Sequence, residues 1–211
     1  MVAAKICGLR TPAAVRAAVR GGAAALGFVL VPASPRHLTP AEAAALAAGA
    51  PAGVARVAVL VDPDDPLAEA AAAFADVLQL HGREPPERVQ ALRARTGRAV
   101  WKGVGVAAPA DVADAVARYG PVADRLLLDA RPPDGATFPG GHGMPFDPAI
   151  LAGQALPAGW ILSGGLTAET LAKAVRRTGA AMVDVSSGVE ERPGVKSLAK
   201  IEAFLKAAAG V

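Results

Sequence analysis

The only cysteine of this 211-residue chain, Cys7, lies two residues after Lys5 at the end of a short apolar run. Residues two apart on a β-strand point to the same face, so we expect Lys5 and Cys7 to share a face and Ile6 to point the other way. A nearby cation lowers the pKa of a thiol, and the thiolate is the form that takes a proton or attacks carbon. The spacing therefore predicts a basic cysteine activated by Lys5. The alternative is a small buried hydrophobic side chain.

Other apolar runs of strand length also end in polar residues. Asp129 follows the run 126–128, and a carboxyl group in apolar surroundings is expected to have a raised pKa. Such a group keeps its proton near neutral pH and can act as a general acid, although an isolated aspartate is more often a helix cap or a salt-bridge partner. Gln79 and His81 end another run and share a face, which makes them candidates for substrate binding.

Asp184 and Ser186 share a face at the end of the last apolar run. If the sheet closes, this strand lies beside the first one, so Asp184 is a candidate partner of Lys5 as well as a candidate substrate contact. Arg36 follows Ser34 and Pro35 in a predicted loop, and its planar guanidinium group matches a carboxylate. Loop arginines are commonly solvated, so the sequence alone leaves the role of Arg36 open.

Two predicted loops near the C-terminus are rich in glycine and serine. Gly164 and Gly165 follow one apolar run, and Ser186, Ser187 and Gly188 follow the next. Glycines allow backbone N–H groups to approach an anion, and a following helix presents its positive end. These loops predict a phosphate-binding site; the alternative for the glycine pair is a tight turn.

The candidate site residues can meet only if the strands that carry them are arranged side by side with their ends together. The sequence contains eight apolar runs of strand length, most of them followed by an alanine-rich helical pattern, at 2–6, 25–29, 55–61, 77–80, 99–104, 126–128, 160–162 and 182–185. Prolines suited to a first helical turn precede several of these patterns, at Pro12, Pro40, Pro66, Pro85 and Pro109.

Eight such units predict an α/β fold, a single (β/α)8 TIM barrel that occupies residues 1–211 as one domain. Barrel enzymes place their chemistry at the carboxyl ends of the strands, where the polar residues above are found. A doubly wound open sheet is the alternative, but it would typically have six units and a glycine-rich fingerprint after the first strand, which is absent. The segment 131–148 has no clear helix, and we interpret 138–146 as a mobile active-site loop.

Composition excludes several other classes. One cysteine permits no internal disulfide and no zinc site built from cysteine clusters, which favours a cytoplasmic protein. No stretch predicts a signal peptide or a membrane span. The net charge is only +3, and the arginines are spread along the chain without clustered aromatic residues, which argues against nucleic-acid binding. The oligomeric state, monomer or homodimer, is left open.

The motifs in order resemble those of the phosphoribosylanthranilate isomerase family of tryptophan biosynthesis, over essentially the whole chain. The matching segments are Lys5-Ile6-Cys7-Gly8-Leu9, Ser34-Pro35-Arg36, Gln79-Leu80-His81-Gly82, Leu127-Leu128-Asp129, Ser163-Gly164-Gly165-Leu166, and Asp184-Val185-Ser186-Ser187-Gly188-Val189-Glu190 with Pro193-Gly194-Lys196.

The resemblance implies an Amadori rearrangement of N-(5-phosphoribosyl)anthranilate to 1-(2-carboxyphenylamino)-1-deoxyribulose 5-phosphate, without metal or organic cofactor. By the family pattern, Asp129 would protonate the ring oxygen and Cys7 would take the proton from C2 of the opened sugar. Arg36 would face the anthranilate carboxylate, and the glycine and serine loops would hold the phosphate.

One departure from the family pattern concerns the sixth loop. The family usually has Gly-Gly-Thr-Gly followed by a basic residue, whereas this chain has Gly140-Gly141-His142-Gly143 followed by Met144. The acid and base are unaffected, so we expect activity. Two alternatives remain: a histidine-pathway isomerase, which would carry aspartate in place of Cys7, and a catalytically silent phosphate-binding barrel.

Overall fold

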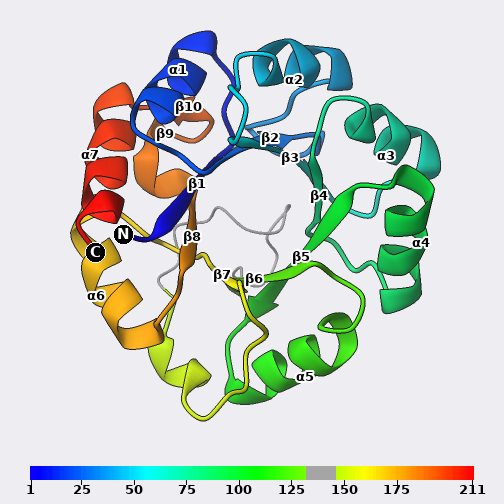
Figure 1. The fold of residues 1–211 in the computed structure, drawn as a ribbon, viewed down its shortest axis with the longest axis vertical. Coiled ribbons are helices and arrows are strands. Elements are labelled where there is room, and N and C mark those ends of the chain that lie inside the picture. The colour runs from blue at the N-terminus through cyan, green and yellow to red at the C-terminus, as the bar shows by residue number, and fades with distance from the viewer. Residues whose placement is uncertain (132–145) are drawn as a thin grey trace.

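Eight parallel strands form a closed ring in the computed structural model, which describes residues 1–131 and 146–211 (Figure 1). Each strand pairs with the next, and β8 pairs with β1, so the predicted (β/α)8 barrel is confirmed. The strands are β1 (Ala3–Cys7), β2 (Ala25–Val29), β3 (Ala55–Leu60), β4 (Val77–Leu80), β5 (Ala99–Val106), β6 (Arg125–Ala130), β7 (Ile161–Leu162) and β8 (Met182–Val185).

Helices surround this ring in the described part of the chain. They are α1 (Pro12–Arg20), α2 (Pro40–Ala47), α3 (Asp65–Ala72), α4 (Pro86–Thr96), α5 (Pro109–Tyr119), α6 (Ala168–Thr178) and α7 (Leu198–Ala209), with a short 3-10 helix, η1 (Pro148–Leu151), between β6 and β7. Prolines lie in the first turn of α1 to α5, where a missing N–H costs nothing. The proline prediction is therefore confirmed, and η1 takes the place of the unclear sixth helix.

Strand bounds differ from the prediction by a few residues at some ends. β1 includes Cys7, β3 stops at Leu60, and β5 continues through Gly105 to Val106, because pairing with a neighbour and not hydrophobicity decides where a strand ends. A second 3-10 helix, η2 (Ser187–Val189), and a hairpin of β9 (Glu190–Arg192) with β10 (Val195–Lys196) follow β8. The prediction did not include this hairpin, whose strands are short and polar.

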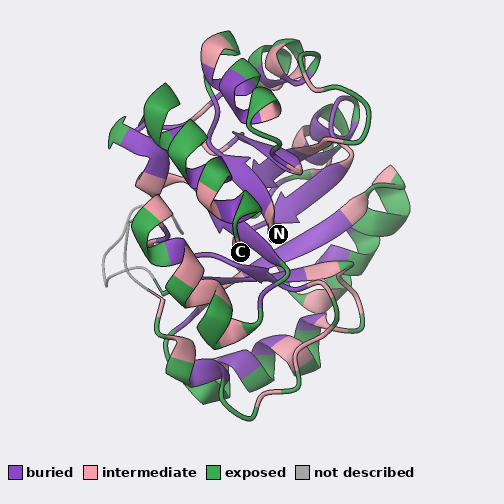
Figure 2. Ribbon diagram, turned by 60° about the vertical axis from the view of Figure 1, so that its left-hand side comes forward, coloured by how far each residue is buried: buried purple, intermediate pink, exposed green. Residues whose placement is uncertain are grey.

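The strands are buried along most of their length (Figure 2). Their buried hydrophobic residues form two larger clusters and a small third one of Cys7, Val29 and Val59. The largest cluster lies between the outer strand faces and the helices and includes Ile6, Leu26, Phe28 and Leu128. The second cluster fills the barrel interior with residues from alternate positions along the strands: Ala25, Val57, Val77, Trp101, Leu127, Ile161 and Met182. Polar side chains continue the interior above this layer, because residues that alternate along a strand share its inner face.

None of the described helices is long and apolar enough to cross a membrane. The chain ends meet on one side of the barrel, where α7 packs against β1 (Figure 1). The predicted mobile loop lies outside the described residues except for Phe146, whose N–H donates to the carbonyl of Gly164.

Candidate active site

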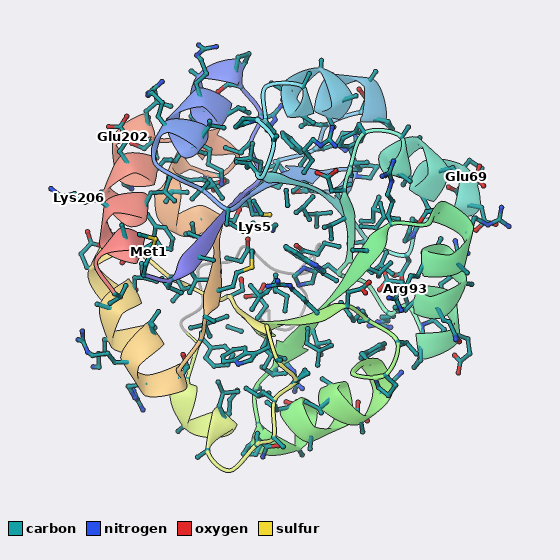
Figure 3. All side chains as sticks on the ribbon, in the orientation of Figure 1. Met1, Lys5, Glu69, Arg93, Glu202 and Lys206 are labelled. Atoms are coloured by element: carbon teal, nitrogen blue, oxygen red, sulfur yellow. The ribbon has the colours of Figure 1, made fainter. Side chains whose placement is uncertain are left out.

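Lys5 and Asp184 form a buried ion pair inside the barrel. Lys5 Nζ lies 2.7 Å from Asp184 Oδ1, and the lysine side chain is fully buried, pointing to the barrel centre (Figure 3). The two residues are register partners on β1 and β8. The prediction that Asp184 pairs with Lys5 is therefore confirmed. Burial lowers the pKa of Lys5, but the charges of Asp184 and Cys7 raise it above its usual value, so Lys5 stays charged.

Cys7 is buried on the same inner face as Lys5, as predicted. The prediction that Lys5 lowers the pKa of the thiol overall is wrong. Burial is the largest influence and raises the pKa of Cys7, Lys5 and Lys196 act to lower it, and the carboxylate of Asp184 raises it again. The net result is a raised pKa, because the effect of burial outweighs that of the two lysines. Cys7 is thus a thiol over most of the pH range.

Gly27 on β2 makes room for the two side chains of β1. A Cβ atom at Gly27 would lie 2.8 Å from Cys7 Sγ and 3.1 Å from Lys5 Cε, closer than side chains normally pack. A glycine inside a strand commonly marks such a close approach. The position of Gly27 within the apolar run 25–29 is the signal that could have identified it from the sequence.

Asp129 ends the inner face of β6 and is almost fully buried. Burial raises its pKa to about 7, and the nearby carboxylate of Asp184 contributes in the same direction. The N–H of Ala130, the hydroxyl of Ser163 and the charge of Lys5 act in the opposite direction and are weaker. The predicted rise through desolvation is confirmed, and a carboxyl group with this pKa keeps its proton at pH values where an exposed aspartate is ionised.

His81 lies beside Asp129 and contacts Gln79. His81 Nε2 is 3.7 Å from Asp129 Oδ2, and His81 Nδ1 is 3.2 Å from the side-chain nitrogen of Gln79. Burial and the charges of Lys102 and Lys5 lower the pKa of His81 to about 3, so its imidazole is neutral. Among residues 1–131 and 146–211, the amide oxygen of Gln79 has no hydrogen-bond partner although it is buried. A buried polar atom of this kind is suited to a ligand.

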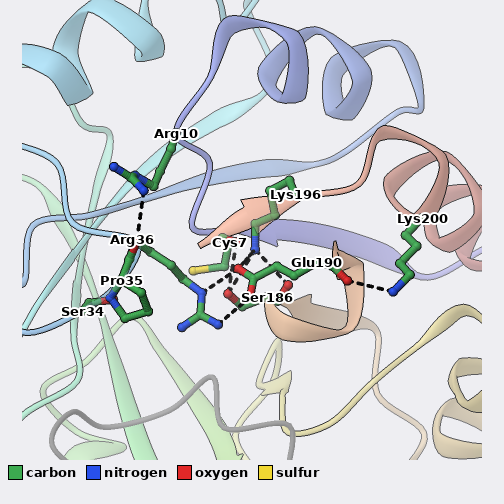
Figure 4. Close-up of polar contacts among 9 residues, drawn as sticks. All are labelled: Cys7, Arg10, Ser34, Pro35, Arg36, Ser186, Glu190, Lys196 and Lys200. Atoms are coloured by element: carbon green, nitrogen blue, oxygen red, sulfur yellow. Dashed lines mark hydrogen bonds and ion pairs between the residues drawn. The ribbon is translucent and has the colours of Figure 1, made fainter. Parts of the chain in front are cut away.

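Arg36 and Glu190 form a second buried ion pair (Figure 4). The Nε and Nη2 atoms of Arg36 each donate to one oxygen of Glu190 at 2.8 Å. This two-point contact fixes the guanidinium plane in the loop after β2. The side chain of Arg36 lies against Gly8, where a Cβ would be 2.5 Å from Arg36 Cδ. Gly8 also has a φ of 75°, which favours glycine.

Lys196 on β10 joins this pair to β1. Its Nζ donates to Glu190 Oε1 and to the carbonyl of Ser186, both at 2.8 Å. The hydroxyl of Ser186 donates to the carbonyl of Cys7 at 3.2 Å. The β9–β10 hairpin therefore fastens the loop after β8 to the strand end that carries Cys7 (Figure 4).

The two glycine-bearing loops touch each other. A Cβ at Gly188 would clash with the carbonyl oxygen of Leu166, and Gly164 and Gly165 both have positive φ angles, of 98° and 60°. Gly164 also lies against β6, where a Cβ would meet the backbone nitrogen of Ala130 at 2.7 Å. One rim of the barrel thus carries Gly164, Gly165, Ser186, Ser187 and Gly188. The hydroxyl of Ser186 already donates to the carbonyl of Cys7 and accepts from Lys196 Nζ.

All candidate residues named from the sequence lie at the carboxyl ends of the strands, and some further residues at the site were not recognised. Glu190 and Lys196 belonged to a matched motif but received no role, and Lys102 and Glu84 form a buried pair near His81. No cluster of three metal-ligating side chains exists within the described residues. The described groups can donate a proton from Asp129, accept one at Cys7, and bind anions nearby.

A family model for N-(5'phosphoribosyl)anthranilate (PRA) isomerase matches residues 4–207 of the chain. N-(5'-phosphoribosyl)anthranilate isomerase of Cereibacter sphaeroides is 53% identical over 209 residues, covering 98% of both proteins. The enzyme of the same name from Paracoccus denitrificans is 52% identical over 206 residues, covering 97% of this chain and 95% of the relative.

Solved structures agree with these sequence matches. Phosphoribosyl anthranilate isomerase from Thermotoga maritima has a TM-score of 0.89 and 33% identity, and all of both chains is covered. A phosphoribosyl anthranilate isomerase in complex with reduced 1-(o-carboxyphenylamino)-1-deoxyribulose 5-phosphate has a TM-score of 0.86, 32% identity and the same coverage. With its matching barrel and strand-end residues, the chain belongs to the N-(5'-phosphoribosyl)anthranilate isomerase family.

Proposed function

We propose that the strand ends of this chain carry out the isomerisation for which its family is named, with Asp129 as the acid and Cys7 as the base. The reaction converts N-(5'-phosphoribosyl)anthranilate to 1-(2-carboxyphenylamino)-1-deoxyribulose 5-phosphate. The observation that carries these roles is the buried carboxyl group of Asp129, with a pKa of about 7, in the same barrel mouth as the single thiol. β1 and β6 are not neighbours, so the two groups approach a substrate from different sides.

The first step is ring opening. Asp129 donates its proton to the ring oxygen as the C1–O bond breaks, and the electron pair on the anthranilate nitrogen forms a C=N bond. A carboxyl group that is protonated near neutral pH is suited to this donation. The neutral side chain of His81 adds no charge that would pull the proton away.

The second step is proton removal from C2 of the opened sugar. The thiolate of Cys7 accepts this proton, and the C2 electrons form the enolamine. Protonation of C1 and loss of the C2 hydroxyl proton then give the ketone. Because the pKa of Cys7 is raised and that of Asp129 is about 7, the productive form, with a protonated acid and a thiolate base, is a minor form of the free protein.

Arg36 is proposed to recognise the anthranilate carboxylate. It lies in the loop after β2, close to the Cys7 strand end, and Glu190 already fixes its plane. A planar cation held in this way recognises a second carboxylate with little loss of side-chain entropy. Arg36→Lys keeps the charge but loses this geometry, so we expect slower turnover with unchanged inhibition by inorganic phosphate.

The phosphate group is proposed to bind at the rim formed by Gly164, Gly165, Ser186, Ser187 and Gly188. Gly164 and Gly165 both have positive φ angles, and backbone N–H groups in turns of this kind bind anions well. Gln79 and His81, together with the carboxylate of Asp184, complete the proposed substrate pocket.

The test is conversion of N-(5'-phosphoribosyl)anthranilate, followed by the loss of its fluorescence. Wild-type protein is expected to turn over, whereas Asp129→Asn and Cys7→Ser should each lose about 10²- to 10⁴-fold in kcat, because each removes one positioned proton-transfer group. Near wild-type kcat in either folded variant would refute the assigned roles. Inactive wild-type protein would refute the substrate.

The wider setting is also a proposal. We propose that residues 1–211 act as one domain in the cytoplasm, as a monomer or homodimer, without a metal or organic cofactor and without a nucleic-acid partner. The single cysteine and the small net charge of +3 support this setting. One matched structure from Thermotoga maritima is of monomers generated from a dimeric phosphoribosylanthranilate isomerase.

A further inference from the structure

Lys102 and Glu84 form a buried ion pair on the outer face of the barrel, behind His81. Lys102 Nζ lies 3.1 Å from Glu84 Oε2, and both side chains are at most 2% exposed. The neighbouring Trp101 packs inside the barrel, so Lys102 points outward, toward the ring of Tyr119 on α5. A buried lysine and glutamate are costly unless their polar atoms are satisfied, so this pair needs an explanation.

Both charged groups hold the backbone around His81. Lys102 Nζ donates to the carbonyl of Gly82 at 2.9 Å and to that of Gly103 at 2.8 Å. Glu84 Oε2 accepts from the N–H of Gly82 at 3.0 Å. Gly82, the residue that follows His81, is therefore hydrogen-bonded at both its N–H and its carbonyl.

The same pair ties the loop after β4 to the loop after β3. Glu84 Oε1 accepts from the N–H of Asp62 at 2.8 Å, and Asp62 Oδ1 accepts from the N–H of Arg83 at 2.8 Å. Asp62 has a φ of 44°, a backbone conformation that costs energy outside glycine and persists where surrounding contacts enforce it. Gly82 fits only because it lacks a side chain, since a Cβ there would lie 2.6 Å from Asp62 Cγ.

On the inner face, the imidazole ring of His81 lies directly against β5. A Cβ at Gly103 would be 2.7 Å from His81 Nδ1, so the absent side chain is what admits the ring. The N–H of His81 donates to the carbonyl of Leu60 at 2.8 Å. With its backbone and ring both confined, His81 directs Nε2 toward Asp129 Oδ2, at 3.7 Å.

We propose that Glu84 and Lys102 are positioning residues that hold His81 against Gly103, and that His81 thereby positions the carboxyl group of Asp129 for proton donation. This inference rests on the proposed role of Asp129 as the acid. A contact of 3.7 Å in the free protein can shorten when substrate binds, as is common for catalytic hydrogen bonds.

The charge of Lys102 adds a second effect. Among the described residues, the charged groups that act on or contact His81 are Lys102 on β5, Lys5 on β1 and Asp129 on β6, and Glu84 and Asp62 act on Lys102 in turn. Burial is the largest cause that lowers the pKa of His81, to about 3, and the charge of Lys102 is the next. A neutral imidazole leaves the proton of the pair on Asp129, where ring opening requires it.

The test uses a double variant, Glu84→Gln with Lys102→Met, which removes both charges and leaves no unpaired buried ion. The matched control is Arg56→Met with Asp76→Asn, which removes an ion pair of 2.6 Å that links the beginnings of β3 and β4, away from His81. Two properties are measured in each protein: steady-state kinetics and the nitrogen NMR signals of the His81 ring.

The double variant should lose about 10- to 100-fold in kcat with little change in KM, because a small displacement of an acid slows chemistry more than binding. Its His81 signals should change, and the ring should take up a proton closer to the usual pKa of about 6.5. The control should keep both the wild-type kcat and the wild-type signals.

Wild-type kcat and unchanged His81 signals in the folded double variant would overturn the proposal. If the double variant does not fold, Glu84→Gln alone is measured: it keeps an oxygen for the N–H groups of Asp62 and Gly82, and Lys102 still donates to the carbonyls of Gly82 and Gly103. If wild-type protein shows no isomerase activity, the proposed function fails, and unchanged His81 signals in the variant would then still overturn the positioning by Glu84 and Lys102.

Discussion

The two sides of the barrel mouth surround their reactive groups with differently charged residues. Cys7 lies on a charged wall, which we define as Lys5, Cys7 and Asp184 on β1 and β8. Asp129 lies on a neutral wall, which we define as Gln79, His81 and Asp129 on β4 and β6. On the charged wall the ions are paired at 2.7 Å. On the neutral wall Asp129 contacts the uncharged imidazole of His81, which in turn contacts the amide of Gln79, and the charges of Asp184 and Lys5 act on Asp129 from the other wall.

This difference matches what each group has to do. An acid is useful if it keeps its proton until the substrate is in place, and a buried neutral setting gives Asp129 a pKa of about 7. A base has to exist as an anion at least briefly, and a nearby ammonium group stabilises that anion once it forms. In the free protein Asp184 weakens the stabilisation of the Cys7 thiolate by Lys5, because Asp184 is paired with Lys5 and its own charge raises the pKa of Cys7.

The largest effect is expected from breaking the charged wall. Asp184→Asn leaves the fully buried Lys5 without its carboxylate, and loss of one partner of a buried pair typically costs about 3–5 kcal/mol in the free energy of unfolding. The variant should also lower the pKa values of both Cys7 and Asp129, because the Asp184 charge raises both. Urea unfolding and the pH profile of kcat/KM measure the two effects. Unchanged stability would show that Lys5 is not held by Asp184.

The buried carboxyl group of Asp129 should make the free energy of unfolding depend on pH. A carboxyl group whose pKa is about 7 when folded and about 4 when unfolded binds more protons in the folded state between these values. Stability therefore falls as pH rises through this window, by about 4 kcal/mol in total. Asp129→Asn does not titrate, so its stability relative to wild type should increase from about pH 4 to about pH 7. Urea unfolding at several pH values is the measurement, and parallel curves for the two proteins would contradict this expectation.

A smaller effect is expected from crowding the charged wall. Gly27→Ala places a methyl group 2.8 Å from Cys7 Sγ, so the thiol or its strand has to move. Overpacking of this kind costs about 1–3 kcal/mol. The thiol should also react at a different rate with a small alkylating reagent. The control is Gly210→Ala, whose added Cβ has ordinary van der Waals space around it. Gly53→Ala is unsuitable, because Gly53 has a φ of 89°.

The smallest effect is expected outside both walls. Arg20 and Glu202 form a surface ion pair of 3.5 Å with side chains more than half exposed. Glu202→Gln should change the free energy of unfolding by less than about 0.5 kcal/mol and leave kcat unchanged. A large loss of activity in this variant would mean that the walls are not the main electrostatic influence on the site.

The sequence predicted the barrel well, because strand ends, prolines and helix faces repeat along it. It placed β2, β4 and β8 at their observed bounds. It did not predict the β9–β10 hairpin, whose strands are stabilised by Lys196 and Glu190 binding each other and other elements. Glu190 also binds Arg36, far away in the chain, and a contact of this kind leaves no periodic pattern.

For the site, the sequence identified the groups but not their environment. It related Lys5 to Cys7 by their spacing and to Asp184 by closure of the sheet, yet the sign of the pKa shift at Cys7 was wrong because burial outweighs the lysine. Lys102 resembles a surface lysine in the sequence, and its pairing with Glu84 could not be predicted. The glycines at 27 and 103 were the available signals, since a glycine inside a strand indicates close packing.

The neutral wall keeps a proton on the acid, and the roles proposed for Asp129 and His81 depend on this property. It is tested most directly by a carbon NMR titration of the Asp129 carboxyl group in substrate-free protein, with the signal assigned by its loss in Asp129→Asn. We predict a midpoint near 7, where burial and the charge of Asp184 place it. A midpoint near the ordinary aspartate value of about 4 would contradict this assignment, because Asp129 would then be ionised when the substrate arrives.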